Sequence, residues 1–323
     1  MLTHEFRAMN TSVLLAAEGR PARVEAGFRQ VEERVLDFAE RFSRFNPESE
    51  VSRLNRSGGT WSVVSAELFE MLHLALRLHA ETQGLFDPAM LPDLERAGYD
   101  RGMDEIGAEG GELSSGEQAA APAPRPAFSG LRLDAALSAA LLPEGLRVDL
   151  GGIAKGWIAE RAAGILGSFA ETCLVDAGGD MYLSGLPAGE KTWQVALEDP
   201  FDPRRDAALL AVGPGAVATS SVTRRAWKQD GQPRHHLIDP RSGRPAEGAW
   251  VSVTVTAAHT AQAEVLAKAL LVGGPDLAAG LLARQHGAEY IAVDRSGDLW
   301  GSAGSRRLLA DENSFDAIME RIE

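Results

Sequence analysis

The chain has 323 residues, of which 45% are hydrophobic and 24% charged, and it carries a formal net charge of −14. Its length and apolar content suffice for a large buried core, so we expect a globular protein. The acidic excess disfavours binding to nucleic acid or to an anionic membrane surface, and no segment reaches the roughly 20 apolar residues of a membrane span. The expected partners are small molecules or other proteins.

The single cysteine and the N-terminus carry separate predictions. Cys173 is the single cysteine and lies in an apolar run, so it is predicted to be a small buried residue rather than part of a disulfide or a metal cluster. The first ten residues, MLTHEFRAMN, contain neither a basic segment followed by an apolar run nor a cysteine for lipid attachment. We therefore expect the sequence as given to stay in the cytoplasm.

Two long helices are predicted in the first part of the chain. Apolar residues recur at steps of three and four from Val24 to Phe42, which is the helical period. A second helix is expected after the N-cap residue Ser65 and before Gly84. Residues 106–130 mix glycine, serine, alanine and proline with acidic residues and show no period, so they are predicted to be a mobile insertion.

The second half reads as short strands separated by turns, which favours the α+β class with an antiparallel or mixed sheet covered by helices. The expected strands are LRLD (131–134), LRVDL (146–150), CLVDAGGDMYLSG (173–185, with a turn), WQVALED (193–199), GAVATSS (215–221) and WVSVTVTA (250–257). Helices are expected over 260–271, 275–286 and 314–323, and a hairpin over 289–302 turning at Ser296 and Gly297.

The segment RVDLGGIAKGWIAERAAGIL (147–166) places Gly151 and Gly152 at a predicted turn from strand to helix, with Lys155 in the first helical turn. Free backbone N–H groups and the lack of Cβ atoms suit an anion such as a pyrophosphate, which would also offset the lysine's unfavourable position in the helix dipole. The alternative is a tight turn packed against a neighbouring strand, with Lys155 in solvent. This segment alone does not decide between them.

Residues 215–248 concentrate hydroxyl groups, arginines and two histidines. This composition suits a site that holds a phosphorylated ligand and moves a proton beside it, and His236 is the candidate for the proton transfer. Asp239 precedes Pro240 and is expected to set a turn.

Eight segments, taken in order, resemble the ApbE family of FAD:protein FMN transferases. They are FRAMNTSVLL, RFSRFNPESEVSRLN, GLFDPAMLPDLERAGYD, VDLGGIAKGWIAE, CLVDAGGDMYLSG, VATSSVTRRAW, HHLIDPRSGRP and AQAEVLAKALLVGG. The resemblance implies one catalytic unit over residues 1–323, an architecture related to tandem T-fold units, and FAD in a groove between the two halves of the chain. It also implies that the FMN half of FAD is transferred to a threonine or serine hydroxyl of a target flavoprotein, with release of AMP.

The resemblance also assigns site residues. Contacts with FAD are implied for Met9, Phe45, Leu85, Phe86, Asp87, Asp149, Lys155 and Ile238, and a main-chain metal contact for Gly152. His236 and Lys155 are the implied catalytic residues. Many family members have Met-Gly-Thr where this chain has Met9, Asn10 and Thr11, so the local turn is expected to differ.

A larger departure concerns magnesium. The family usually has an aspartate and, four residues later, a threonine or serine that help bind Mg²⁺, whereas this chain has Glu264 and Lys268. Glutamate can ligate Mg²⁺ but an ammonium group cannot. Three hypotheses follow. Glu264 and Lys268 could simply form an ion pair on one helix, or the charge of Lys268 could replace the metal ion in the transfer reaction. In the third, the chain has lost FMN transfer and is an FAD-binding protein or an FAD pyrophosphatase. Family members are commonly exported and membrane-anchored, in contrast to the cytoplasmic location expected above.

Overall fold

The computed structural model describes residues 1–102, 105–106, 112–113, 125–229, 232–285 and 287–310. The chain divides into two compact units. Unit 1 comprises Met1–Leu36, Lys155–Arg224 and Gly248–Glu323, and unit 2 comprises Asp37–Ala154 and Arg225–Glu247. That the whole chain acts as one catalytic unit stays a prediction, as does an FAD groove between its halves.

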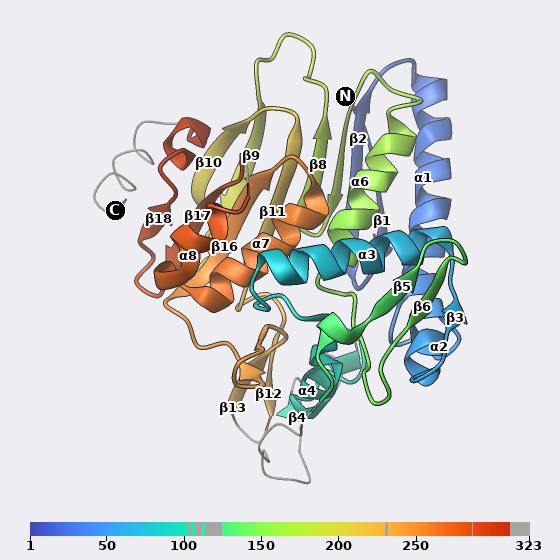
Figure 1. The fold of residues 1–323 in the computed structure, drawn as a ribbon. Helices are drawn as coiled ribbons and strands as arrows, with labels where there is room; N and C mark the ends of the chain where they lie inside the picture. Colours follow the sequence, from blue (N-terminus) through green and yellow to red (C-terminus); the bar gives the residue numbers. More distant parts are fainter. Residues whose placement is uncertain (103–104, 107–111, 114–124, 230–231, 286, 311–323) are drawn as a thin grey trace. The chain divides into compact units, whose positions relative to one another are not determined.

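Unit 1 is built on an eight-stranded sheet in the order β1-β2-β7-β8-β11-β16-β17-β18 (Figure 1). All of its neighbouring strands are antiparallel. The strands are β1 (Leu2–Ala8), β2 (Thr11–Glu18), β7 (Thr172–Ala177), β8 (Asp180–Ser184), β11 (Gly215–Ser221), β16 (Trp250–Ala257), β17 (Glu289–Asp294) and β18 (Leu299–Gly301). The α+β class with an antiparallel sheet is therefore confirmed, as is the predicted hairpin at Ser296 and Gly297.

Helices cover this sheet because their apolar residues face it. The helix α7 (Thr260–Gly273) packs on β8, β11 and β16, and α8 (Pro275–Leu282) packs on α7 (Figure 1). Two of the four points at which the chain passes from one unit to the other lie in helices: α1 (Pro21–Phe42) contains the division after Leu36, and α6 (Ala154–Leu166) contains the division after Ala154. The helix α8 ends at Leu282, earlier than predicted. The next N–H groups, of Arg284 and Gln285, donate to carbonyls three residues back, at 3.3 and 2.8 Å, instead of four residues back as in an α-helix.

A separate hairpin of β9 (Trp193–Glu198) and β10 (Asp206–Val212) buries alternate residues against the main sheet. Trp193, Val195 and Leu210 belong to one apolar cluster with Leu183 and Val217 of the sheet. The period of two in WQVALE indicates this half-buried strand, whereas β10 was not predicted.

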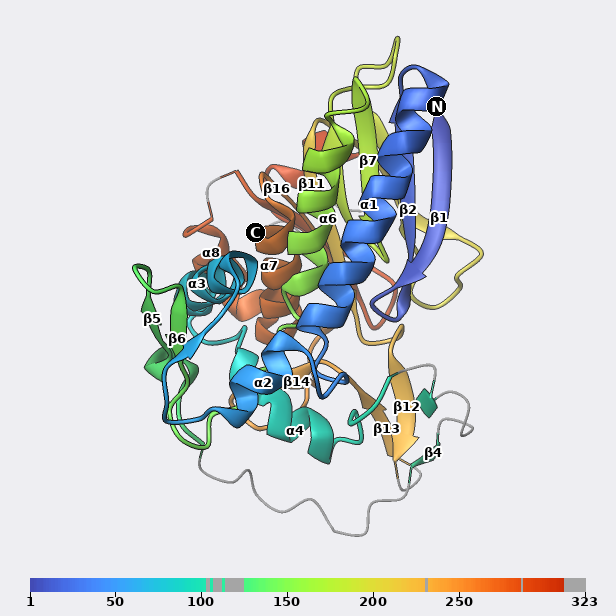
Figure 2. The same cartoon turned by 90° about the vertical axis from the view of Figure 1, so that its right-hand side faces the viewer.

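Unit 2 combines short helices with three small sheets. Its helices are α2 (Glu50–Arg56), α3 (Ala66–Glu81), η1 (Pro88–Met90), α4 (Leu91–Arg96) and η2 (Phe128–Gly130). Its strands are β3 (Ser62–Val63), β4 (Glu112–Leu113), β5 (Arg132–Asp134), β6 (Ala139–Leu141), β12 (Ala226–Gln229), β13 (Gln232–His235), β14 (Ile238–Asp239) and β15 (Arg244–Pro245), with β12 beside β13 and β4 (Figure 2). Ser65 caps α3 by accepting the N–H of Leu68, as predicted.

The predicted strand over residues 146–150 is wrong. Among the described residues this segment has no strand partner. Instead, the side-chain amide of Asn55 donates to the carbonyl of Val148 at 2.9 Å and accepts the Val148 N–H at 2.8 Å. The N–H of Asp149 donates to the carbonyl of Pro88 at 2.9 Å. A side chain and a loop carbonyl thus take the place of a neighbouring strand, which a local pattern cannot reveal.

Two predictions fall largely outside the described residues: most of the mobile insertion over 106–130 and the helix over 314–323. Within the described part, Cys173 is buried as predicted. Across the same part, every helix is too short or too polar to cross a membrane.

Candidate functional site

Tyr99 is the centre of an aromatic cluster in unit 2. Its ring lies 5.7 Å from that of Phe45 at 69°, 5.6 Å from that of Trp227 at 28°, and 6.4 Å from the imidazole of His236 at 68°. The guanidinium of Arg44 lies over the Phe45 ring at 4.2 Å and over the Tyr99 ring at 4.8 Å. Two predicted site residues, Phe45 and His236, are therefore brought to the same tyrosine.

Backbone hydrogen bonds hold this cluster in place. Tyr99 follows α4, its N–H donates to the carbonyl of Leu94 at 2.8 Å, and its own carbonyl accepts from Arg44 at 2.5 Å. Trp227 of β12 donates its indole N–H to the carbonyl of Ala97 at 2.9 Å. Burial raises the pKa of the Tyr99 phenol, so the hydroxyl stays protonated and available as a donor at neutral pH.

The glycine segment joins the aromatic cluster through Asp149. Its carboxylate lies 3.3 Å from Arg44 Nε and also accepts the N–H of Gly151 at 2.8 Å. A Cβ on Gly151 would lie 3.1 Å from Asp149 Oδ1, so glycine permits this close approach. The turn before α6 thus depends on a carboxylate of its own segment, and Gly152 follows it half-buried.

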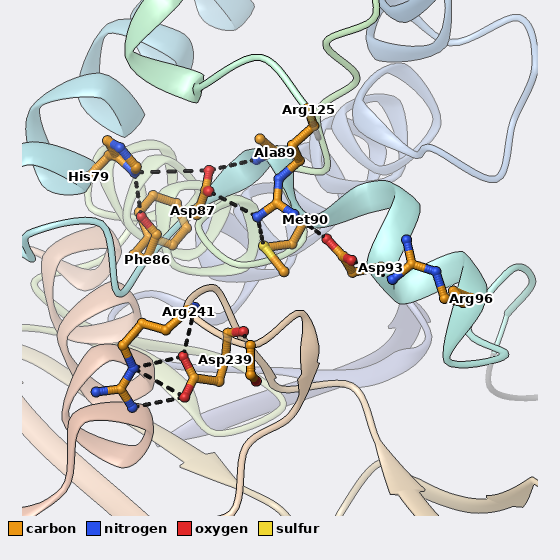
Figure 3. A network of polar contacts seen from close by, with 11 residues as sticks. His79, Phe86, Asp87, Ala89, Met90, Asp93, Arg96, Arg125, Asp239 and Arg241 are labelled. Carbon is orange, nitrogen blue, oxygen red and sulfur yellow. Dashed lines mark hydrogen bonds and ion pairs between the residues drawn. The ribbon is translucent and has the colours of Figure 1, made fainter. Parts of the chain in front are cut away.

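The segment GLFDP forms a second polar network in unit 2 (Figure 3). Asp87 caps η1 by accepting the N–H of Ala89 at 2.9 Å, and its carboxylate lies 3.5 Å from Arg125 and 4.0 Å from His79 Nδ1. The imidazole of His79 also contacts the carbonyl of Phe86 at 2.7 Å. Leu85 and Phe86 are buried beside this network.

Met90 contacts both the polar network around Asp87 and the aromatic cluster around Tyr99. Its sulfur lies 2.6 Å from an Arg125 nitrogen, and its side chain belongs to the buried apolar cluster that also contains Tyr99, Trp227 and Ile238. Ile238 is therefore placed with Phe45 and His236, as one site would require. Asp239 forms an ion pair with Arg241 at 2.8 Å and accepts the Arg241 N–H at 2.9 Å, which fits its predicted turn role (Figure 3).

In unit 1, Lys155 and Glu264 belong to a cluster of four charged side chains, which we call the charge cluster: Lys155, Asp180, Glu264 and Lys268. Lys155 forms an ion pair with Asp180, and its Nζ lies 3.3 Å from Glu264 Oε1. Lys268 Nζ lies 2.9 Å from that same oxygen, and the N–H of Gly156 donates to Glu264 Oε2 at 2.8 Å. Lys155 is thus held by carboxylates rather than extended into solvent.

The two carboxylates of the charge cluster are fully desolvated: Glu264 is 0% and Asp180 1% exposed. Burial alone would raise the pKa of Glu264, but Lys155, Lys268 and the Gly156 N–H outweigh it and lower that pKa to about 2. The expected ion pair four residues apart is present, and it is a buried one rather than a surface pair.

Met9 lies at the β1–β2 turn of unit 1. Ala8 pairs with Thr11, and the two turn residues have φ of 54° at Met9 and 56° at Asn10. Positive φ at both positions is the type I′ hairpin geometry, which asparagine tolerates nearly as well as glycine. Asn10 therefore preserves a tight turn where many family members have glycine.

The site residues that sequence reasoning missed are Arg44, Tyr99, Trp227 and Arg125 in unit 2 and Asp180 in unit 1. Arg44, Tyr99, Trp227 and Asp180 lie inside segments that carry the family resemblance, whereas Arg125 lies outside them. Apart from Phe45, which follows Arg44 directly, their partners come from other segments, so the contacts depend on tertiary packing.

Comparison with known proteins identifies the family of this chain. The chain matches the model of the ApbE family over residues 9–292. A Vibrio cholerae protein named FAD:protein FMN transferase is 30% identical over 254 residues, 76% of this chain and 73% of that protein. A Treponema pallidum protein of the same name is 29% identical over 284 residues, 80% of this chain and 74% of that protein.

The fold agrees as well. The crystal structure of the ApbE protein from Thermotoga maritima matches with a TM-score of 0.80 and 25% identity over 96% of this chain and 99% of that one. The agreement covers both units of the chain, and the family match includes Phe45, Asp149, His236 and Glu264. The chain therefore belongs to the ApbE family.

Proposed function

We propose that this chain transfers the FMN half of FAD to a threonine or serine hydroxyl of a target flavoprotein and releases AMP. The observation that carries the proposal is the match across residues 9–292 to a family whose members are named FAD:protein FMN transferase. The grouping of Phe45, Asp149, His236 and Ile238 around Tyr99 and Arg44 supports it, because these residues were assigned to flavin binding and proton transfer independently of their positions in space.

The proposed reaction is a phosphoryl transfer. The acceptor hydroxyl oxygen attacks the phosphorus on the FMN side of the pyrophosphate, and the bond from that phosphorus to the bridging oxygen breaks. AMP leaves with the electron pair, and the FMN phosphate becomes a phosphoester. Such a transfer requires from the protein mainly positioning, charge stabilisation and a base for the hydroxyl proton.

His236 is the proposed acceptor of that proton. Imidazole accepts a proton near neutral pH, and packing against the edge of Tyr99 orients the ring. The backbone N–H of His236 donates to the carbonyl of Arg225 at 3.4 Å, which fixes the start of the HHLIDP segment. A positioned base of this kind contributes about 10²- to 10⁴-fold to the rate.

Flavin contacts are proposed for Phe45, Leu85, Phe86, Asp87, Asp149 and Ile238 in unit 2 and for Met9 and Lys155 in unit 1. Aromatic faces and guanidinium planes bind flat ring systems by stacking, so Arg44 and Tyr99 join the proposed set. The turn at Gly151 and Gly152, just before α6, is the proposed position for the pyrophosphate, because glycine lets a ligand approach the backbone closely. The N–H groups of Gly151, Ile153, Ala154 and Gly156 donate to acceptors of the protein itself.

Magnesium is the one part of the family resemblance that the residues do not fit. Both oxygens of Glu264 already interact with the positive or N–H groups of Lys155, Lys268 and Gly156. No step of the proposed reaction therefore relies on a metal ion.

The test is product analysis after incubation of the chain with FAD, with and without a flavoprotein acceptor that offers a threonine. Transfer predicts that AMP and acceptor-bound FMN form together, and only when the acceptor is present. Free FMN with AMP in the absence of acceptor would show a pyrophosphatase instead. Bound but unchanged FAD in every sample would show a binding protein, and either result would overturn the proposal.

A further inference from the structure

The charge cluster is electrically complete without an added ion. Its two ammonium groups, on Lys155 and Lys268, balance the carboxylates of Asp180 and Glu264, so these four side chains sum to a formal charge of zero. The carboxyl of Asp176 also interacts electrostatically with Lys155, but burial raises its pKa. All four side chains are mostly buried: Lys155 is 14% and Lys268 15% exposed, and the carboxylates are at most 1% exposed. Buried charges persist where each has a partner, and here each has one.

A divalent cation does not fit at Glu264. Mg²⁺ requires oxygen ligands at about 2.0–2.1 Å in octahedral geometry. A cation at that distance from Glu264 Oε1 would lie within roughly 5 Å of the ammonium nitrogens of both Lys155 and Lys268. A charged lysine has no lone pair to donate, so Lys268 repels the ion instead of binding it.

The other oxygens nearby do not change this result. Glu264 Oε2 accepts the N–H of Gly156, and Asp180 is paired with Lys155. Thr260, one helical turn before Glu264, has a buried hydroxyl with no hydrogen-bond partner among the described residues. One neutral hydroxyl does not supply the ligand number or the negative charge that a dication needs.

The contacts of Glu264 hold the ammonium group of Lys268 in one position. Glu264 is held from one side by Gly156 of α6 and Lys155, and Lys268 approaches the same carboxylate from its own helix, four residues later. Gly156 makes this contact possible, because α6 lies so close to α7 that a Cβ there would come within 2.6 Å of the Thr260 carbonyl oxygen. The ammonium group is therefore a fixed point charge rather than a mobile surface lysine.

We infer that this chain transfers FMN without a divalent metal, because the Lys268 ammonium, fixed on Glu264, occupies the place that the family resemblance assigns to magnesium. The inference rests on the proposed function, since it concerns the charge that stabilises the pyrophosphate during that transfer. Two residues carry this difference. This chain has Glu264 and Lys268 at the positions where, by the resemblance, family members usually have aspartate and threonine or serine.

The experiment has two independent readouts on the full chain purified in the presence of a chelator. The first is the initial rate of FMN transfer to a threonine-containing flavoprotein, with EDTA or with added Mg²⁺. The second is a calorimetric titration of Mg²⁺ into the FAD-loaded chain. The inference predicts the same rate in EDTA and in Mg²⁺ and no saturable Mg²⁺ binding. Loss of the rate in EDTA with recovery in Mg²⁺, or saturable Mg²⁺ binding by the native chain, would overturn it.

Variants at Lys268 test the charge itself. Lys268→Met keeps the length of the side chain without its charge and is expected to lower the metal-free rate about tenfold or more, whereas Lys268→Arg keeps the charge and retains more of the rate. Lys191→Met is the matched control, because Lys191 is exposed and makes no contact in the charge cluster. A Lys268→Met variant as active as the native chain would contradict the inference.

The two readouts separate this inference from the proposed function. If no acceptor is modified under any condition, the proposed transfer is wrong, and the Mg²⁺ titration alone then decides about the metal. If Lys268→Met fails to fold, the rates of the native chain in EDTA and in Mg²⁺ decide.

Discussion

Single residues show most clearly what a sequence can and cannot predict. Lys155 was predicted at the start of a helix, where its charge needs an anion nearby, and that position is confirmed. The structure supplies carboxylates of the protein, Asp180 and Glu264, as the anions. Charge and position are visible locally in a sequence, but the partner is not, because Asp180 and Glu264 reach Lys155 only through the packing of β8 and α7.

His236 is the residue whose removal should most affect chemistry without affecting binding. We expect His236→Ala to lower the rate of FMN transfer by about 10²- to 10⁴-fold, because the acceptor hydroxyl loses its base, while the Kd for FAD stays the same. The measurement is single-turnover transfer beside an FAD binding titration. His73→Ala, on the exposed side of α3, should behave as the native chain. Transfer at the native rate by His236→Ala would rule out the proposed role.

Met9 has a left-handed backbone conformation, with φ of 54°, that costs a side-chain-bearing residue about 1–2 kcal/mol. A methionine at this strained position is explained if its side chain contacts the flavin. We expect Met9→Gly to leave stability unchanged or slightly higher while raising the Kd for FAD about 5- to 10-fold, equivalent to roughly 1 kcal/mol of lost apolar contact. Asn10→Gly, in the same turn, should leave the Kd unchanged. An unchanged Kd in Met9→Gly would remove Met9 from the proposed site.

Among the elements, those with a strong period were predictable and those held by distant partners were not. The helices α1, α3, α6 and α7 follow from apolar residues spaced three and four apart, and β9 from strict alternation. The segment over 146–150 has strand composition, yet Asn55 satisfies its backbone in place of a strand. The strands β1 and β2 and the helix α2 were missed because their exposed or short patterns carry little signal.

The close approach of α6 to α7 gives an element-scale test. Gly156→Ala should destabilise the protein by about 1–3 kcal/mol, because its Cβ would lie 2.6 Å from the Thr260 carbonyl oxygen and would separate the helices. Gly164→Ala is the matched control on the same helix. Its Cβ would meet nothing within 4 Å, so it should be neutral or more stable by up to about 1 kcal/mol. Urea unfolding of both variants decides, and equal stabilities would contradict the packing described here.

At the scale of the whole molecule, the family and the α+β class were predictable because eight motifs occur in order along the chain. The division into two units was not, because unit 2 is assembled from two segments that are far apart in sequence. Aromatic residues from both segments, Tyr99 and Trp227, stack at 5.6 Å. The proposed site therefore depends on tertiary packing that no single stretch of sequence contains.

The charge cluster should also give global stability a distinctive pH dependence. Because the folded-state pKa of Glu264 is depressed to about 2 from 4.5, its stabilising contribution is complete above pH 4.5 and is lost as the pH falls towards 2. We expect the native chain to exceed Glu264→Gln in unfolding free energy by a constant amount at neutral pH. That gap should narrow as the pH falls from 4.5 towards 2, because Glu264 takes up a proton in the folded state only near the lower end of this range. Urea midpoints across this range measure it, and a gap independent of pH would contradict the ionised, buried Glu264.

Fragmentation mass spectrometry of the acceptor protein locates the transferred group and so tests the proposed transfer itself. After incubation of this chain with FAD and a target flavoprotein, we expect a peptide that carries FMN through a phosphoester on a threonine or serine, with one AMP released for each modified acceptor. An unmodified acceptor beside free FMN and AMP, or beside intact FAD, would contradict it.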